Sequence, residues 1–271
     1  MESTTRFRLS VQYDGTAYRG WQVQPSDRTV QGELERVLSR LFDRPTRVLG
    51  SGRTDTGVHA TGQVAVVDGP ARWSPERLQR ALNALLPADV RVPSVTEAAP
   101  GFHPRYDAVS RAYRYRIGTS PAARSPFHAP WCWLVDRPID LARMGEATAM
   151  LVGEHSFRAF AKAGQEERGD RCIVTQAEWA EWPGLGVELR IAANRFLHHM
   201  VRYLAGTLVA IGTGEREVRE MEMLLIGAGD LLTSPPAPAR GLFLVHVTFP
   251  GEPQSELALR SLPSPDPSFT P

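Results

Sequence analysis

The sequence predicts an α+β protein made of two ferredoxin-like halves, each with the element order β-α-β-β-α-β. In the first half, segments in which apolar and polar residues alternate, as in strands, and segments in which apolar residues recur every three or four positions, as in helices, follow one another in that order. The second half repeats the order loosely. The 271 residues, of which 42% are hydrophobic, suffice for two such cores. We expect the halves to form a mixed or antiparallel sheet with helices on one face.

The elements of the first half follow from local patterns. Residues 7–13 alternate between apolar and polar side chains, as in a half-buried strand. A helix is expected after them because apolar residues recur at helical spacing; they are Val30, Leu34, Val37, Leu38 and Leu41. Short strands at 46–50 and 63–67 flank a glycine-rich loop. A helix is expected over 74–87, with Ser74 as its N-cap and Pro75 in its first turn. Residues 90–95 are expected to form the last strand of this half.

The second half is read in the same way. Its expected strands are residues 109–118, 172–182, 186–193 and 241–249, and its expected helices are 141–151, 196–212 and 215–227. The domains are therefore 1–106, which carries the Asp55 loop, and 107–250, which carries Tyr113 and Arg202. Residues 251–271 are rich in proline and serine and are expected to form a mobile tail.

The overall composition argues against several classes of protein. No apolar run is long enough to cross a bilayer, and no apolar stretch follows the first charges as in a signal peptide. Cys132 and Cys172 stand alone, which argues against a disulfide scaffold and against a cysteine-rich zinc site. His198 and His199, as adjacent helical positions, would point about 100° apart and would not chelate together. We expect a soluble cytoplasmic protein with no membrane segment and no metal.

The loop at 50–57 gathers reactive side chains between glycines. It contains Arg53, Thr54 and Asp55, and His59 follows closely. Asp55 begins an Asp-Thr-Gly tripeptide like that of aspartic proteases, but those need two carboxylates that share a proton, and a second copy would have to come from a homodimer. Arg53 would instead keep the carboxylate ionised. Asp55 is thus either a turn residue whose carboxylate accepts hydrogen bonds from backbone N–H groups or a nucleophile. The crowding of reactive side chains in this loop favours the nucleophile.

Two further features involve arginine. Arg202 lies in an otherwise apolar helical segment, where a cation is costly unless it is paired or reaches water; Asp55 is a candidate partner. Arginines also alternate with tyrosines over residues 105–124, a composition suited to phosphate contacts and base stacking as well as to an ordinary strand with a solvated face. The residues of this stretch are Arg105, Tyr106, Arg111, Tyr113, Arg114, Tyr115, Arg116 and Arg124.

Taken together, the motifs resemble the tRNA pseudouridine synthase A family from about residue 7 to 248. The stretches that carry the resemblance are, in chain order, YDGTAYRGWQVQP, TVQGELERVL, GSGRTDTGVHATGQVA, LNALLPADVRV, GFHPRYDAVSRAYRYRI, GEHSFRAFAKAG, ANRFLHHMVRYLAGTL and PPAPARGLFLVHV. The resemblance implies the pseudouridine synthase fold and isomerisation of uridines 38–40 in the tRNA anticodon stem-loop. It also implies a homodimer that needs no cofactor and no metal.

Residue roles follow from the same resemblance. Asp55 would be the nucleophile, Arg53 would help displace the target base, Tyr113 would stack on the flipped uracil, and Arg202 would pair with Asp55. Further substrate contacts are expected from Thr54, His59, Arg105, Arg111 and Arg114. The carboxylate could attack C1′ of the ribose, attack C6 of the uracil, or assist loss of the C2′ proton. The alternatives to this activity are a non-catalytic RNA-binding module and a dimeric aspartic protease.

Overall fold

The structure is a computed structural model, and it describes residues 3–162, 169–228 and 230–252. Contacts divide these residues into two compact units. Unit 1 contains the chain up to Val109 together with Phe243–Gly251, and unit 2 contains Ser110–Leu242. Both units combine helices and strands, which confirms the predicted α+β class.

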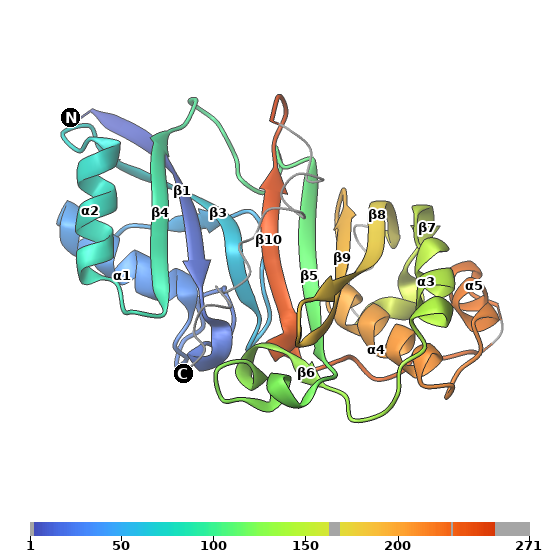
Figure 1. Ribbon diagram of the computed structural model, residues 1–271. Coiled ribbons are helices and arrows are strands. Elements are labelled where there is room, and N and C mark those ends of the chain that lie inside the picture. Colours follow the sequence, from blue (N-terminus) through green and yellow to red (C-terminus); the bar gives the residue numbers. More distant parts are fainter. Residues whose placement is uncertain (1–2, 163–168, 229, 253–271) are drawn as a thin grey trace. The chain divides into compact units, whose positions relative to one another are not determined.

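Unit 1 has the ferredoxin-like order that the sequence predicted for the first half, with one strand added (Figure 1). Its elements are β1 (Thr4–Tyr13), α1 (Val30–Phe42), β2 (Val48–Gly50), β3 (His59–Pro70), α2 (Pro75–Leu85), β4 (Val90–Glu97) and β10 (Leu242–Thr248). The strands lie in the order β4-β1-β3-β10, with β2 paired to β3. β1 is antiparallel to both β3 and β4, whereas β10 runs parallel to β3.

The core of unit 1 forms where the apolar face of β1 meets the helices. Phe7, Leu9 and Val11 are completely buried, as their alternation predicted. The hydroxyl of Thr29 accepts the Gly32 N–H at the start of α1, and Ser74 caps α2 in the same way. Phe42 of α1 and Phe7 of β1 both crowd the α-carbon of Gly69, so α1 lies on the face of the sheet to which Phe7 points.

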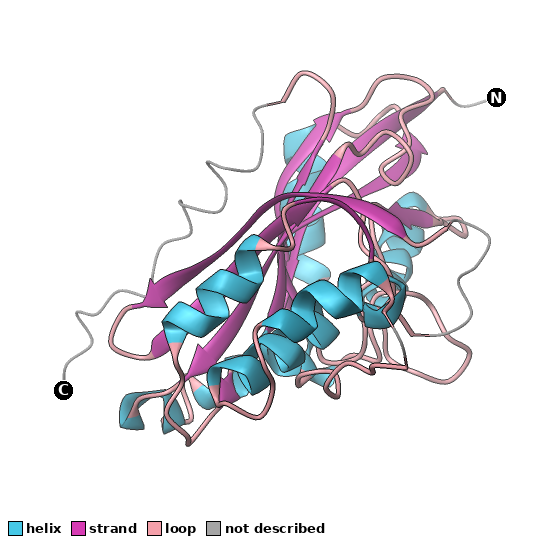
Figure 2. Cartoon of the chain, turned by 90° about the vertical axis from the view of Figure 1, so that its right-hand side faces the viewer, coloured by secondary structure: helices cyan, strands magenta, loops and turns pink. Residues whose placement is uncertain are grey.

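Unit 2 has a four-stranded antiparallel core with helices against it. Its elements are β5 (Ser110–Gly118), β6 (Trp133–Leu134), α3 (Leu141–Ala149), β7 (Gly153–Ser156), β8 (Arg171–Trp182), β9 (Gly186–Ala193), α4 (Met200–Gly212) and α5 (Arg219–Ile226). The strands lie in the order β5-β9-β8-β7, with β6 parallel to β5. α3 contacts α4, α5 and β8, and the helices lie on one side of these strands (Figure 2).

The structure differs from the sequence-based predictions in three respects, namely the assignment of the last strand, two short strands and two helix starts. The sequence assigned the last strand to the domain 107–250, but Phe243–Gly251 belongs to unit 1 because β10 pairs with β3. Strands β6 and β7 were not predicted, since each has only two to four residues. α4 begins at Met200 rather than at 196, and α5 begins at Arg219 rather than at 215. The predicted mobile tail, 251–271, lies outside the described residues from 253 onwards.

Within the described ranges, none of the helices combines the length and the apolar character that a bilayer crossing requires.

Candidate active site

Asp55 lies in the loop of unit 1 that joins β2 to β3, and the backbone on both sides of it is held by hydrogen bonds. The carbonyl of Thr54 accepts the Trp21 N–H at 3.0 Å. The carbonyl of Asp55 accepts the Val58 N–H at 3.1 Å, which closes a tight turn. The side chain of Asp55 is partly exposed. The loop therefore presents a carboxylate at the surface of unit 1 from a fixed backbone.

The segment 14–21 is packed directly against this loop, and three glycines make that possible. A Cβ on Gly15 would lie 2.0 Å from the Val58 carbonyl oxygen, and one on Gly20 would lie 2.6 Å from the Thr54 carbonyl oxygen. The position equivalent to Cβ on Gly50 is 2.6 Å from the indole ring of Trp21. At Gly15 and Gly20 backbone thus meets backbone, and at Gly50 an indole ring meets backbone, which limits the movement available to the Asp55 loop.

Tyr18 connects the loop to the rest of unit 1. Its carbonyl accepts the Gly57 N–H at 3.3 Å, and its hydroxyl donates to Asp89 at 2.6 Å. Arg28 donates two hydrogen bonds to the same carboxylate and lies 4.3 Å above the Tyr18 ring. Burial and the bond to Asp89 both raise the pKa of Tyr18, so the phenol is neutral at physiological pH. The resulting network fixes one side of the Asp55 turn.

Two residues that the sequence assigned to substrate binding point into unit 1 instead. The Thr54 side chain is 7% exposed, and its Oγ1 lies 2.7 Å from the Tyr13 hydroxyl. His59 is 2% exposed, accepts the Gly15 N–H through Nδ1, and stacks on Phe243 at 4.7 Å between ring centroids. Direct contact with a substrate, as predicted, would require both side chains to leave these partners. Arg53, by contrast, is exposed.

In unit 2, Tyr113 lies on β5 and is partly exposed. Its ring meets Phe196 edge to face, with 5.0 Å between centroids and 82° between planes. Arg111, two residues earlier on the same face of β5, donates to the Asn194 carbonyl at 3.0 Å. Both side chains therefore contact the segment between β9 and α4, and Tyr113 keeps an aromatic surface on which a planar base can stack.

Arg202 lies in the first turn of α4 and holds a neighbouring loop. Its Nε donates to the Ala237 carbonyl at 2.8 Å, and its own carbonyl accepts the Ala237 N–H at 2.9 Å. One turn later, a Cβ on Gly206 would lie 2.2 Å from the Pro235 carbonyl oxygen, so this loop runs close along the helix. These contacts explain how a cation is accommodated in an apolar helix. The ion pair between Arg202 and Asp55 stays a prediction.

The remaining predicted arginines have different surroundings. Arg114 is 4% exposed, and its guanidinium lies 3.3 Å from the carboxylate of Glu188. Glu188 also accepts from Arg190 at 2.9 Å. Burial lowers the pKa of Arg114 from its ordinary value, and the nearby Glu188 carboxylate opposes that effect. Arg114 is thus part of an internal charge cluster, so an RNA contact would require it to turn outward. Arg105 is exposed.

The sequence placed His198 and His199 within a helix, and the structure shows that this was wrong. His198 and His199 precede α4, which begins at Met200, and His199 has a left-handed backbone with φ of 67°. Their rings are 4.1 Å apart between centroids, rather than spread around a helix. The expectation of no metal therefore no longer follows from helical geometry and remains an expectation.

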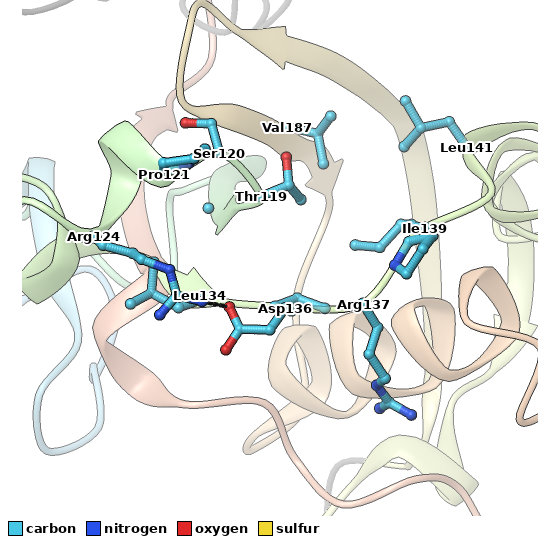
Figure 3. Close-up of a pocket in the computed structure, with 13 residues that line it drawn as sticks. Thr119, Ser120, Pro121, Arg124, Leu134, Asp136, Arg137, Ile139, Leu141 and Val187 are labelled. Carbon is cyan, nitrogen blue, oxygen red and sulfur yellow. Dashed lines mark hydrogen bonds and ion pairs between the residues drawn. The ribbon is translucent and has the colours of Figure 1, made fainter.

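A pocket of about 400 Å³ in unit 2 contains none of the predicted site residues (Figure 3). It lies between the end of β5 and the segment 134–141, and apolar side chains such as Leu134 and Ile139 line much of it. Its charged side chains are already paired, Arg124 with Asp136 and Arg137 with Glu215. Paired charges leave no surplus cation for a phosphate, so this pocket is not assigned to RNA binding.

Sequence reasoning missed the supporting residues Tyr13, Tyr18 and Trp21. All three are at most 5% exposed, and each contacts the Asp55 loop through a hydrogen bond described above. The available signal was the density of aromatic residues and glycines in YDGTAYRGW, which is unusual for a simple strand-to-helix connection.

Comparison with known proteins identifies the family of this chain. The family described as tRNA pseudouridine synthase matches residues 9–107 and 147–250. A tRNA pseudouridine synthase A of Methylococcus capsulatus is 41% identical over 249 residues, covering 91% of this chain and 90% of that protein. The protein of the same name from Geobacillus kaustophilus is 40% identical over 252 residues, with 92% and 96% covered. That of Bacillus pumilus is 37% identical over 246 residues, with 90% and 99% covered. A match over this much of the chain, at this identity, shows that the chain belongs to the tRNA pseudouridine synthase family of isomerases.

Proposed function

We propose that this protein converts uridine to pseudouridine at positions 38–40 of the tRNA anticodon stem-loop, with Asp55 as the nucleophile. The observation that carries the proposal is the state of the Asp55 loop. The peptide groups on both sides of Asp55 are hydrogen-bonded, while its carboxylate remains partly exposed. A nucleophile needs both properties, a backbone that holds the carboxylate in place and a side chain that a substrate can reach.

The reaction breaks the N1–C1′ glycosidic bond, turns the base, and joins C5 of the uracil to C1′, with release of the C5 hydrogen. It transfers no electrons to or from the protein, so the requirements are an ionised nucleophile and a surface that retains the detached base. Attack on C1′, attack on C6 and assistance in loss of the C2′ proton all use the same ionised carboxylate.

The other residues have defined parts in the proposal. The exposed guanidinium of Arg53 takes the place of the flipped nucleotide, whose extrusion costs a few kcal/mol. Tyr113 stacks on the uracil while it rotates, and Phe196 holds the tyrosine ring from its edge. Arg202 orients the Asp55 carboxylate and keeps it ionised. Arginines supply a salt-sensitive share of the RNA affinity. The enzyme acts in the cytoplasm as a homodimer.

Release of tritium from tRNA labelled at uridine C5 tests the chemistry, because formation of the new C–C bond exchanges that hydrogen with water. We expect release by the wild type, none by Asp55→Asn or Asp55→Ala, and wild-type release by the control Asp43→Asn. Asp43 is an exposed residue with φ of 54°, a conformation that asparagine adopts readily.

Each alternative function predicts a different result in this assay. An active Asp55→Ala variant would remove Asp55 from the chemistry. Binding of tRNA without release by the wild type would indicate an RNA-binding module, and cleavage of peptides would indicate the protease. Replacing uridines 38, 39 and 40 by cytidine, singly and all together, tests the position. Release that persists when all three are replaced would contradict the anticodon assignment.

A further inference from the structure

We propose that the buried hydroxyl pair of Tyr13 and Thr54 is a positioning device for the Asp55 carboxylate. This inference deepens the proposed function and rests on Asp55 being the nucleophile. It gives Thr54 a role different from the substrate contact that the sequence predicted. It also assigns a role to Tyr13, the last residue of β1, which the sequence predicted only as part of a half-buried strand.

Thr54 is fixed at two atoms by two different segments of unit 1. Its Oγ1 lies 2.7 Å from the hydroxyl of Tyr13, and either oxygen can be the donor. Its carbonyl accepts the N–H of Trp21 at 3.0 Å. The first contact fixes the side-chain rotamer, and the second fixes the plane of the peptide that links Thr54 to Asp55. Together with the hydrogen bond from the Val58 N–H to the Asp55 carbonyl, which holds the next peptide, they set the direction in which the Cα–Cβ bond of Asp55 leaves the backbone.

The solvent exposure of the side chains changes along the Asp55 loop in a way that fits this positioning role. Arg53 is exposed, Thr54 is buried and Asp55 is partly exposed, so the buried side chain lies between two that reach solvent. Holding the Thr54 side chain inward therefore directs the Asp55 side chain outward. Without the Tyr13 contact, the Thr54 side chain no longer anchors the loop to β1, and the peptide that carries Asp55 can shift.

Tyr13 is itself held in place. Its side chain is 5% exposed, and its ring lies 6.0 Å from that of Trp21, at 38° between planes. Trp21 in turn packs against the α-carbon of Gly50, at the end of β2 where the loop begins. The hydroxyl that Thr54 meets is thus attached to a rigid support, which a positioning contact needs.

Packing alone would not require the two hydroxyls. Replacing both members of a buried hydrogen-bonded pair with apolar groups of similar shape can be nearly neutral for stability. Phenylalanine at 13 and valine at 54 would keep the volume and lose only the directional contact. A catalytic carboxylate is sensitive to that loss, because a misplacement of about 1 Å can cost on the order of 100-fold in rate.

The experiment measures the single-turnover rate of tritium release at saturating tRNA, the Kd for tRNA, and urea unfolding. The variants are Tyr13→Phe, Thr54→Val, their combination, and Thr54→Ser, which keeps the hydroxyl. The matched control is Thr148→Val in unit 2. Thr148 is also buried, with its Oγ1 bonded to the Met144 carbonyl and to Nε1 of Trp179.

We expect each single variant to lose about 10- to 100-fold in rate with unchanged Kd. The double variant should lose no more than either single one, because both remove the same contact. Thr54→Ser should stay near the wild type, and Thr148→Val should lose stability without losing rate. Wild-type rates in Thr54→Val and Tyr13→Phe, or rate losses that simply add in the double variant, would overturn the inference. No release by the wild type would instead overturn the proposed function, and the inference with it.

Discussion

Replacing Gly20 with alanine should displace the peptide that carries Asp55. Gly20 has φ of +88°, and its added Cβ would lie 2.6 Å from the Thr54 carbonyl oxygen and 3.2 Å from the carbonyl carbon of Asp55. Both are backbone atoms, so no side-chain rotation can relieve the contact. Because Cβ atoms in proteins essentially never approach closer than 3.0 Å, the backbones must separate by at least 3.0 − 2.6 = 0.4 Å.

The cost can be worked out against a matched control. Gly101 has a similar φ of +82°, but nothing lies within 4 Å of the Cβ position. Gly101→Ala therefore costs only the backbone strain of an L-residue at positive φ, about 1–2 kcal/mol. Gly20→Ala costs that strain and, in addition, weakens the Trp21–Thr54 hydrogen bond, which is worth about 1 kcal/mol. The free energy of unfolding should fall by about 2–3 kcal/mol, against about 1–2 kcal/mol for the control.

Urea unfolding followed by tryptophan fluorescence gives both free energies, and tritium release from labelled tRNA gives the single-turnover rate. We expect Gly20→Ala to lose turnover while still folded, and Gly101→Ala to keep it. Equal unfolding free energies and equal rates for the two variants would refute the argument that close backbone packing holds the Asp55 loop.

Four further predictions concern Arg202, Tyr113, Asp68 and Cys172. Arg202→Leu should lower the single-turnover rate more than it weakens tRNA binding; a loss of affinity at an unchanged rate would contradict its proposed role beside the carboxylate. Tyr113→Phe should retain most activity, since stacking needs only the ring, and complete loss would show that the hydroxyl takes part in the chemistry. The hydrogen bond from Arg6 lowers the pKa of Asp68 below its usual 3.8, with the Arg6 charge acting in the same direction and partial burial opposing it. The pair therefore stabilises the fold above pH 3.8 and loses that contribution as the pH falls through the lowered pKa. Because the pair is partly solvated, Asp68→Asn should cost at most about 1 kcal/mol at pH 7. Urea unfolding should show this difference from the wild type shrinking as the pH falls below 3.8. Burial raises the pKa of Cys172 to about 11, so iodoacetamide at pH 8 should modify this thiol only after unfolding; rapid modification of the folded protein would contradict its burial.

Much of unit 1 could be predicted because its signals are local. The cap residues Thr29 and Ser74, the apolar spacing of α1 and the alternation in β1 each involve a few neighbouring positions. The start of α4 was placed four residues too early because Phe196 and Leu197 continue the apolar pattern. Those residues are held instead by contacts such as that of Phe196 with Tyr113, which hydrophobic periodicity does not register.

The role of Asp55 stays a prediction, whereas the structure describes what surrounds it. Asp55 and Arg53 stand out because reactive side chains crowd between glycines, a property visible in a stretch of eight letters. Thr54 lies in that stretch and His59 follows it by two positions, and nothing in the local sequence distinguishes a side chain that faces a substrate from one that faces the core. Their burial depends on Tyr13 and Phe243, which the chain order places far away.

The sequence by itself determined the α+β class, the elements of the first half and the choice of Asp55, since each depends on residue types at short spacing. Only the tertiary structure decided that Thr54 turns inward to Tyr13, 41 positions away, and that the last strand joins unit 1 beside β3. Burial and strand pairing are properties of surfaces that meet after folding. Side chains of the same chemical type therefore take different roles according to what lies opposite them.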